Sequence, residues 1–159
     1  MTEIRIRLAI PEDREDICRV HRAAILALSD QHYAQNTIDA WSKALTPETV
    51  RQEIGTPSMT WFVAEVAGTV VGFSSTEKNE VSALYVHPDH QNRGIGSKLL
   101  ARVETEAARQ GIRHLTLFAS VNSRRFYETH GYHVTREMIY PLNDEESMTT
   151  LSMDKELTG

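Results

Sequence analysis

The feature that most constrains the fold is one pattern over residues 81–100, where an apolar run leads into a glycine-containing loop and then an amphipathic helix. The apolar run ends at Pro88, the loop contains Gly94 and Gly96, and apolar residues recur every four positions from Ile95. The first N–H groups of a helix lack intrahelical partners and carry the positive end of its dipole. We therefore expect an anion site for a phosphate-bearing cofactor, the plainer alternative being a tight turn without a ligand.

Periodicity along the rest of the chain predicts an α/β fold. The predicted strands are residues 4–8, 60–66, 69–76, 81–86, 112–119, 132–140 and 149–155, and the predicted helices are 12–28, 94–110 and 122–130. Residues 29–57 are predicted to form a helical excursion with short breaks, with one short helix at 37–43 and another that begins at Pro47 after an N-cap at Thr46. This order, β-α-α-β-β-β-α-β-α-β-β, indicates one domain over residues 1–159, with a mixed, largely antiparallel central sheet flanked by helices. Strands 81–86 and 112–119 are expected to pair in parallel, because a helix connects them.

Composition narrows the classes of partner. The net charge of the 159 residues is −5 with His neutral, so we expect no nucleic-acid partner, since such proteins usually carry a basic face. No segment approaches the roughly 20 apolar residues of a membrane helix, and we expect no membrane partner. The single cysteine, Cys18, excludes an internal disulfide and fits a cytoplasmic location. The histidines lack metal-ligand spacing, so no metal is expected.

A second pattern lies downstream, where residues 126–132 read Phe-Tyr-Glu-Thr-His-Gly-Tyr. Together with Gln-Asn-Arg-Gly-Ile-Gly at 91–96, it resembles the GNAT superfamily of acyl-CoA-dependent N-acetyltransferases. The loop matches that family's Q-x-x-G-x-G/A cofactor motif, and the second pattern matches its F-Y-E-x-x-G-F/Y signature. The resemblance covers nearly the whole chain, because the order of elements also agrees. It implies the GNAT fold and acetyl-CoA (coenzyme A) as cosubstrate.

The resemblance also implies how the cofactor is held. Backbone amides of residues 92–97 would cradle the pyrophosphate, and the backbone of residues 84–86 would pair with the pantetheine arm, which requires that strand to splay from its neighbour. Glycine at 94 and 96 lets phosphate oxygens approach the backbone. Ser120 stands where many members carry asparagine, so either Ser120 or Asn122 would touch the arm. The implied cofactor-binding residues are Leu84, Tyr85, Val86, Gln91, Asn92, Arg93, Gly94, Ile95, Gly96, Ser97, Asn122 and Tyr127.

Acetyl transfer to an amine needs a neutral amine, a donor for the tetrahedral oxyanion and a proton for the leaving thiolate. The resemblance assigns the oxyanion to the Leu84 amide and the proton to Tyr127. The ordinary pKa of a tyrosine, about 10, lies near the value of about 8.5 for a thiol, so this proton transfer is feasible. The alternative for Tyr127 is a ring that packs in the core beside Phe126.

Glu80 is the candidate general base, because peptide-acetylating members of the superfamily carry theirs at the head of this strand. Strand alternation is expected to place Glu80 on the same face as Ser82, Leu84 and Val86. Glu77, in the preceding turn, competes for the role. The further alternatives are His21, His32 and His87.

In this family the helical segment between the first two strands shapes the acceptor site, here residues 29–57. Trp41 in this segment either walls the amine pocket or anchors its helix to the core. We expect an acetyl-CoA-dependent N-acetyltransferase that acts on the primary amine of a small molecule by direct attack. A protein or peptide N-acetyltransferase and a noncatalytic acyl-CoA-binding sensor are the alternatives. The oligomeric state stays open; homodimers are common in the family, and the strands within residues 132–155 are the surface that would form one.

Overall fold

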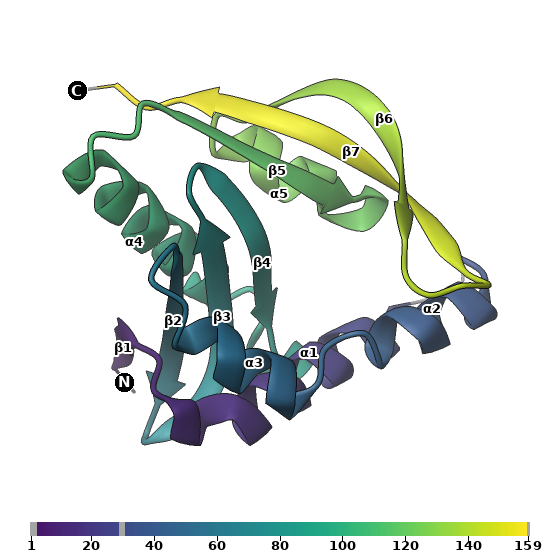
Figure 1. Ribbon diagram of the computed structural model, residues 1–159, viewed down its shortest axis with the longest axis horizontal. Coiled ribbons are helices and arrows are strands. Elements are labelled where there is room, and N and C mark those ends of the chain that lie inside the picture. Colours follow the sequence, from purple (N-terminus) through teal and green to yellow (C-terminus); the bar gives the residue numbers. More distant parts are fainter. Residues whose placement is uncertain (1–2, 29–30, 159) are drawn as a thin grey trace.

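In the computed structural model, which describes residues 3–28 and 31–158, seven strands form one sheet in the order β1-β2-β3-β4-β5-β7-β6 (Figure 1). The strands are β1 Ile4–Leu8, β2 Met59–Val66, β3 Thr69–Glu77, β4 Glu80–Val86, β5 His114–Ser120, β6 His133–Pro141 and β7 Ser147–Glu156. The α-helices are α1 Arg14–Leu26, α2 Gln35–Ser42, α3 Pro47–Ile54, α4 Ile95–Arg109 and α5 Arg124–Thr129. The predicted mixed α/β fold with a largely antiparallel sheet is confirmed.

The helical excursion at 29–57 contains two short helices, as predicted, so the described residues place three α-helices between β1 and β2 where the predicted order of elements counted two. The second of them, α3, begins at Pro47, and the Thr46 side chain accepts a hydrogen bond from the Thr49 N–H at 3.3 Å. Proline has no N–H to continue a preceding helix but is suited to a first helical position, so α2 and α3 stay distinct. Two other predicted helices begin with short 3-10 turns, η1 Pro11–Asp13 and η3 Val121–Ser123.

The sheet opens between β4 and β5. These strands pair in parallel, as predicted, but only through Glu80 opposite Thr116 and Val81 opposite Leu117. Beyond Val81 the two strands diverge, and Figure 1 shows β4 turning away while β5 continues alongside β7. The predicted splay of this strand is therefore present, and it leaves one edge of β4 unpaired.

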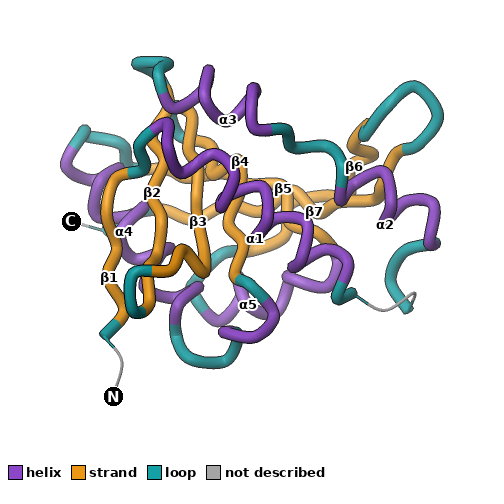
Figure 2. The backbone as a smooth tube through the Cα atoms, turned by 90° about the horizontal axis from the view of Figure 1, so that it is seen from below, coloured by secondary structure: helices purple, strands orange, loops and turns teal. Residues whose placement is uncertain are grey.

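Helices cover both faces of the sheet (Figure 2). On one face, Ile17 of α1 and Val50 of α3 pack with Phe73 of β3. On the other face, Leu99 of α4 joins Tyr127 of α5 in a second cluster. No helix in the described part of the chain is long and apolar enough to cross a membrane.

A β-bulge interrupts β4 at Ser82. Ser75 of β3 lies opposite Ala83, whereas the next β3 residue, Thr76, lies opposite Val81, so Ser82 is the extra residue. One extra residue shifts the two-residue alternation of side chains on the bulged strand.

The bulge corrects the predicted orientation of Glu80. Ala83 and Tyr85 pack on the side of α1 and α3, and Leu84 and Val86 pack on the side of α4. Glu80 lies opposite Glu77, in the row of β3 residues that faces α1 and α3. Its predicted position on the face of Ser82, Leu84 and Val86 is therefore wrong, because simple alternation does not hold across a bulge.

Candidate active site

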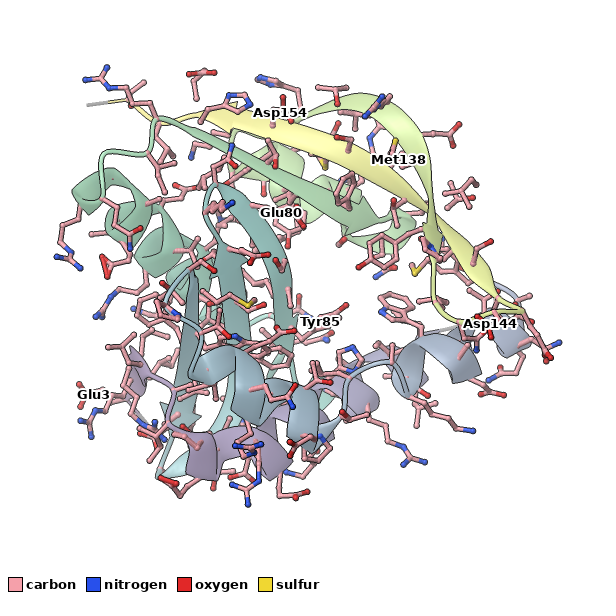
Figure 3. The ribbon with its side chains drawn as sticks, in the orientation of Figure 1. Glu3, Glu80, Tyr85, Met138, Asp144 and Asp154 are labelled. Atoms are coloured by element: carbon pink, nitrogen blue, oxygen red, sulfur yellow. The ribbon has the colours of Figure 1, made fainter. Side chains whose placement is uncertain are left out.

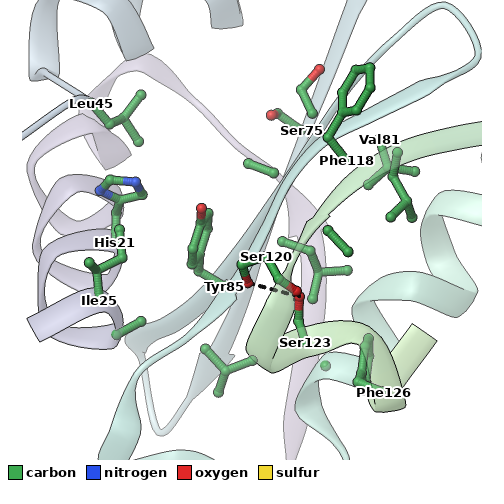
Figure 4. Close-up of a pocket in the computed structure, with 18 of the residues that line it drawn as sticks. His21, Ile25, Leu45, Ser75, Val81, Tyr85, Phe118, Ser120, Ser123 and Phe126 are labelled. Atoms are coloured by element: carbon green, nitrogen blue, oxygen red, sulfur yellow. Dashed lines mark hydrogen bonds between the residues drawn. The ribbon is translucent and has the colours of Figure 1, made fainter. Parts of the chain in front are cut away.

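A cavity of about 1100 Å³ opens where β4 and β5 separate. It is lined by the free edge of β4, the start of α4, and parts of α5, α1 and α2. Figure 4 shows His21 of α1 and Phe126 of α5 on opposite sides of Tyr85. Every predicted cofactor-binding residue except Arg93 lines this cavity, while Arg93 is exposed on the loop outside it.

The loop between β4 and α4 presents free amides at one end of the cavity. Asn92 and Gly94 have φ values of 63° and 82°, and this left-handed backbone turns the chain into α4. The Lys98 N–H donates to the Gly94 carbonyl at 3.0 Å, so the N–H groups of residues 95–97 precede the first helical bond. Gly94 has no side chain to cap them. The positive end of α4 therefore meets the cavity with donors available to an anion.

The two loop glycines are needed for different reasons. At Gly94 a Cβ would meet nothing within 4 Å, so the requirement is its φ of 82°. At Gly96 a Cβ would lie 3.2 Å from the Phe126 ring, so this glycine allows α5 to pack on the start of α4. Gln91 ties the loop to β4, because its side-chain amide donates to the Val86 carbonyl at 3.1 Å.

The Leu84 amide points into the gap beside β4. At the end of β4 the His87 N–H donates to the Val71 carbonyl at 2.8 Å, on the β3 side. Amides alternate in direction along a strand, so the N–H groups of Leu84 and Val86 point away from β3. Since β5 has already separated from β4 there, the Leu84 N–H is left without a strand partner.

Tyr127 of α5 is buried and also lines the cavity. Its ring meets the rings of Phe126 and Tyr132 edge-on, at centroid distances of 5.1 and 5.7 Å. Its hydroxyl forms no hydrogen bond with any described residue. Burial raises the pKa of Tyr127 well above its ordinary value, with a smaller contribution from Tyr85. The phenol therefore keeps its proton at neutral pH and faces the cavity.

Ser120 and Asn122, the two candidates for the cofactor arm, both line the cavity. The Ser120 hydroxyl lies 2.9 Å from the Ser123 hydroxyl, drawn as a dashed line in Figure 4. Asn122 is exposed in η3, and its side chain forms no hydrogen bond with the described residues. Asn122 is thus the candidate whose polar group is free for a ligand.

Glu80 lines the cavity at the far end of β4 from the loop. Figure 3 shows Glu80 and Tyr85 toward opposite ends of this strand. Burial raises the pKa of Glu80, and the nearby charge of Glu77 adds to the effect. Glu77 lies directly opposite and lines the same cavity, so the two competing carboxylates are neighbours.

Of the three histidine alternatives, His21 lines the cavity. Burial lowers the pKa of His21 to about 4, so the ring is neutral at pH 7. His32 is exposed, and the His87 Nδ1 accepts a hydrogen bond from the Asp89 N–H at 3.1 Å. Neither His32 nor His87 lines the cavity.

Trp41 combines the two roles that the sequence left as alternatives, because it lines the cavity while its Nε1 donates to the Tyr85 hydroxyl at 3.2 Å and so anchors α2. One residue of the acceptor side was not predicted from the sequence. Glu53 of α3 also lines the cavity, and burial followed by the charge of Glu77 raises its pKa. Nothing local distinguishes Glu53 from a solvated helix carboxylate, because only the docking of α3 brings it to the cavity.

Comparison with known proteins identifies the family of the chain. The family model of the acetyltransferase (GNAT) domain matches residues 29–157. The chain is 30% identical over 152 residues to the L-methionine sulfoximine/L-methionine sulfone acetyltransferase of Salmonella typhimurium, which covers 84% of this chain and 82% of that protein.

Solved structures agree as well. A GCN5-related N-acetyltransferase from Rhodopseudomonas palustris has a TM-score of 0.89 and 26% identity, over 99% of this chain and 98% of that one. The Salmonella typhimurium acetyltransferase YncA, solved with acetyl-CoA, has a TM-score of 0.67 and 25% identity, over 99% of this chain and 95% of that one. The chain therefore belongs to the GNAT family and is an acetyltransferase.

Proposed function

We propose that this protein transfers the acetyl group of acetyl-CoA directly to the primary amine of a small molecule. The observation that carries the proposal is the gap between β4 and β5, which connects the free amides of α4 with the Leu84 amide and Tyr127 in one cavity. Two comparisons support it. YncA was solved with acetyl-CoA, and the Salmonella relative is named for small amino-acid derivatives.

In this proposal the amides of residues 92–97 hold the pyrophosphate, and the free edge of β4 pairs with the pantetheine arm as an added strand would. Leu84 and Val86 supply N–H groups that face the gap, and Asn122 reaches the arm from η3. No Lys or Arg among the described residues lines the cavity. Backbone donors and the helix dipole therefore supply the positive potential for the phosphates.

The reaction itself needs one new bond and one broken bond. The amine nitrogen attacks the thioester carbon, which forms the C–N bond and places negative charge on the carbonyl oxygen. The Leu84 N–H donates to that oxygen. Collapse of this intermediate breaks the C–S bond, and the thiolate takes its proton from Tyr127. The positively charged nitrogen of the intermediate loses a proton, which returns to the Tyr127 phenolate, leaving an N-acetyl amine and coenzyme A. Nothing in this chemistry requires a metal ion.

Burial serves both proton transfers. The burial that raises the pKa of Tyr127 also disfavours a thiolate in the same cavity, so donor and acceptor stay matched. The incoming alkylamine has a pKa near about 10, as lysine does, and arrives charged. A carboxylate with a raised pKa takes up a proton more readily, and Glu80, with Glu77 as its competitor, is the proposed base.

We further propose that residues 1–159 act as one domain, in the cytoplasm, on a diffusible amine. The Tyr33 hydroxyl donates to the Thr149 carbonyl at 2.6 Å and so joins the segment before α2 to β7. Met148 packs in the same cluster as Trp41. This wall on the acceptor side favours a small molecule over an extended peptide.

The test is release of free thiol from acetyl-CoA across polyamines, aminoglycosides, amino acids and peptides, measured beside equilibrium binding of coenzyme A. We expect cofactor binding and thiol release that depends on an added small amine, with one acetyl group transferred per thiol. Binding without release for any amine would instead support the acyl-CoA sensor. A preference for peptide N-termini would support the peptide N-acetyltransferase.

A further inference from the structure

The charged side chains in the lining of the cavity are of one sign. Three carboxylates, those of Glu53, Glu77 and Glu80, line it, and no Lys or Arg does among the described residues. The three come from α3, the end of β3 and the start of β4. Glu77 lies opposite Glu80, and its charge raises the pKa values of both Glu53 and Glu80. They therefore form one group at the hairpin end of the cavity.

This carboxylate group has no internal counter-ion. Within residues 3–28 and 31–158, none of the three forms an ion pair with Lys, Arg or His, and the one polar partner is the Ser58 hydroxyl, 3.3 Å from Glu77. Glu53 and Glu80 are partly buried, whereas Glu77 is exposed. Like charges at a partly buried site repel one another, and a cation between them relieves that repulsion. The site therefore favours a positively charged guest.

His21 provides an independent sign of a ligand in the same cavity. It is 5% exposed, its Nδ1 is buried without a hydrogen-bond partner, and its ring meets the Tyr85 ring edge-on at 4.8 Å. Figure 4 shows it on the cavity side of α1, facing Tyr85. A buried polar nitrogen without a partner is rare and calls for one. Because burial keeps the ring neutral at pH 7, it offers a hydrogen bond but no charge to a carboxylate.

The sheet connects these two ends. On the face of α1 and α3, successive rows of β2, β3 and β4 run from Glu77 and Glu80, past Trp61 and Ser75, to Tyr85. Two such steps along a strand span about 13 Å. The middle row, beside the Leu84 amide, consists of Trp61, Ser75 and Ala83 and has no charged side chain. A chain-like acceptor therefore meets carboxylates at one end and a neutral aromatic wall at the other.

We infer that the acceptor is a linear amine with a second positive charge and no carboxylate, a diamine or longer polyamine, whose second ammonium lies by Glu53 and Glu77. The inference rests on the proposed acetyl transfer and names its substrate class. The inferred substrate class differs from that of the relative named for methionine sulfoximine, because the carboxylate of an amino acid would bring a further negative charge to a cavity without a cationic side chain.

The test compares three acceptors that differ by one charged group: the five-carbon diamine, pentylamine and lysine. We expect kcat/KM for the diamine to exceed that for pentylamine by about tenfold, and lysine to fall below both. The variant Glu53→Gln should raise KM for the diamine by about fivefold and leave that for pentylamine unchanged, because a half-buried carboxylate–ammonium pair contributes modestly. Glu48→Gln, an exposed carboxylate on the same helix outside the cavity, is the matched control and should change neither value.

Lysine or methionine sulfoximine used as well as the diamine would overturn the inference. So would a Glu53→Gln variant that folds normally and keeps the wild-type KM for the diamine. If no amine releases thiol although coenzyme A binds, the proposed acetyl transfer itself fails. Calorimetric titration of the coenzyme A-loaded protein with the diamine then decides the charge preference separately, and absence of binding refutes it.

Discussion

The sharpest prediction concerns Tyr127→Phe, which removes one oxygen atom and leaves the ring. The Tyr127 ring is buried and packs edge-on against Phe126 and Tyr132, so the packing is kept in the variant. Its hydroxyl forms no hydrogen bond with the described residues, so no partner is left unsatisfied. The substitution therefore isolates the effect of removing the proposed proton donor of the thiolate.

The expected magnitude follows from these contacts. Proton transfer by a positioned side chain contributes about 10²–10⁴-fold to rate, so kcat should fall within that range. Stability should change by less than about 1 kcal/mol, because neither a cavity nor an unpaired polar group is created. Affinity for coenzyme A should stay within about twofold, since the pyrophosphate is held by amides of the α4 loop.

The assay is steady-state thiol release at saturating acetyl-CoA and amine, with calorimetric binding of coenzyme A and thermal unfolding on the same samples. Tyr132→Phe is the matched control. The Tyr132 hydroxyl donates to Glu104 at 2.8 Å, away from the cavity, so its loss should cost about 1 kcal/mol of stability and spare turnover. The two variants thus predict opposite patterns in the two measurements.

One result would refute the assignment of Tyr127 as the acid. If Tyr127→Phe turns over within about threefold of the wild type at saturating amine, the thiolate receives its proton elsewhere, for instance from water. A large loss of coenzyme A affinity in Tyr127→Phe would instead assign Tyr127 to cofactor binding. In either case the role of the loop amides would stand.

Further predictions concern the base and the loop. Glu80 must lose its proton to act as the base, and its pKa is raised, so kcat/KM should increase with pH over a range above that of an ordinary carboxyl group. Glu80→Gln should abolish this increase. If the increase persists in the pH–rate profile of the variant, the base is Glu77 or another group. The same raised pKa means that the folded state binds the proton more tightly than the unfolded one, so stability falls as pH rises through that window, and Glu80→Gln should unfold at a higher temperature than the wild type at pH 7. Gly94→Ala should lower the melting temperature by about 2–4 °C, the effect of roughly 1 kcal/mol for a left-handed alanine, and an unchanged melting curve would contradict it. Gly96→Ala should weaken coenzyme A binding, because the added methyl group would displace the Phe126 ring. The second substitution Phe126→Leu in the same chain should restore binding. If it does not, the glycine is needed for close approach of the phosphates instead.

Much of the fold was predictable because its signals are local. The run from residue 81 to 100 shows its strand, loop and helix through periodicity and glycine placement, and β4, α4 and the parallel pairing with β5 follow. Thr46 and Pro47 likewise indicated the start of α3, although the predicted order of elements counted residues 29–57 as one helical unit.

The site was predictable where it depends on backbone and motif. The cavity contains the loop amides and Tyr127, which lie in the two motifs, and Leu84 and Asn122, which the family resemblance implied. Arg93 was placed outside it, because a long cation at a loop tip is free to point to solvent. The face of Glu80 could not be inferred, since one extra residue at Ser82 leaves no mark in a short, half-apolar strand.

By itself, the sequence determined the order of the strands, the loop that ends at Gly94 and the family, because each depends on neighbouring residues and on spacing along the chain. Only the tertiary structure decided that β4 and β5 part after Val81, and that the Leu84 amide is left open in the gap. It alone also brought Glu53 of α3 beside Glu77 and placed His21 at the other end of the cavity. Those placements arise from packing between segments far apart in the chain, and no local pattern of residues records how helices and sheet dock.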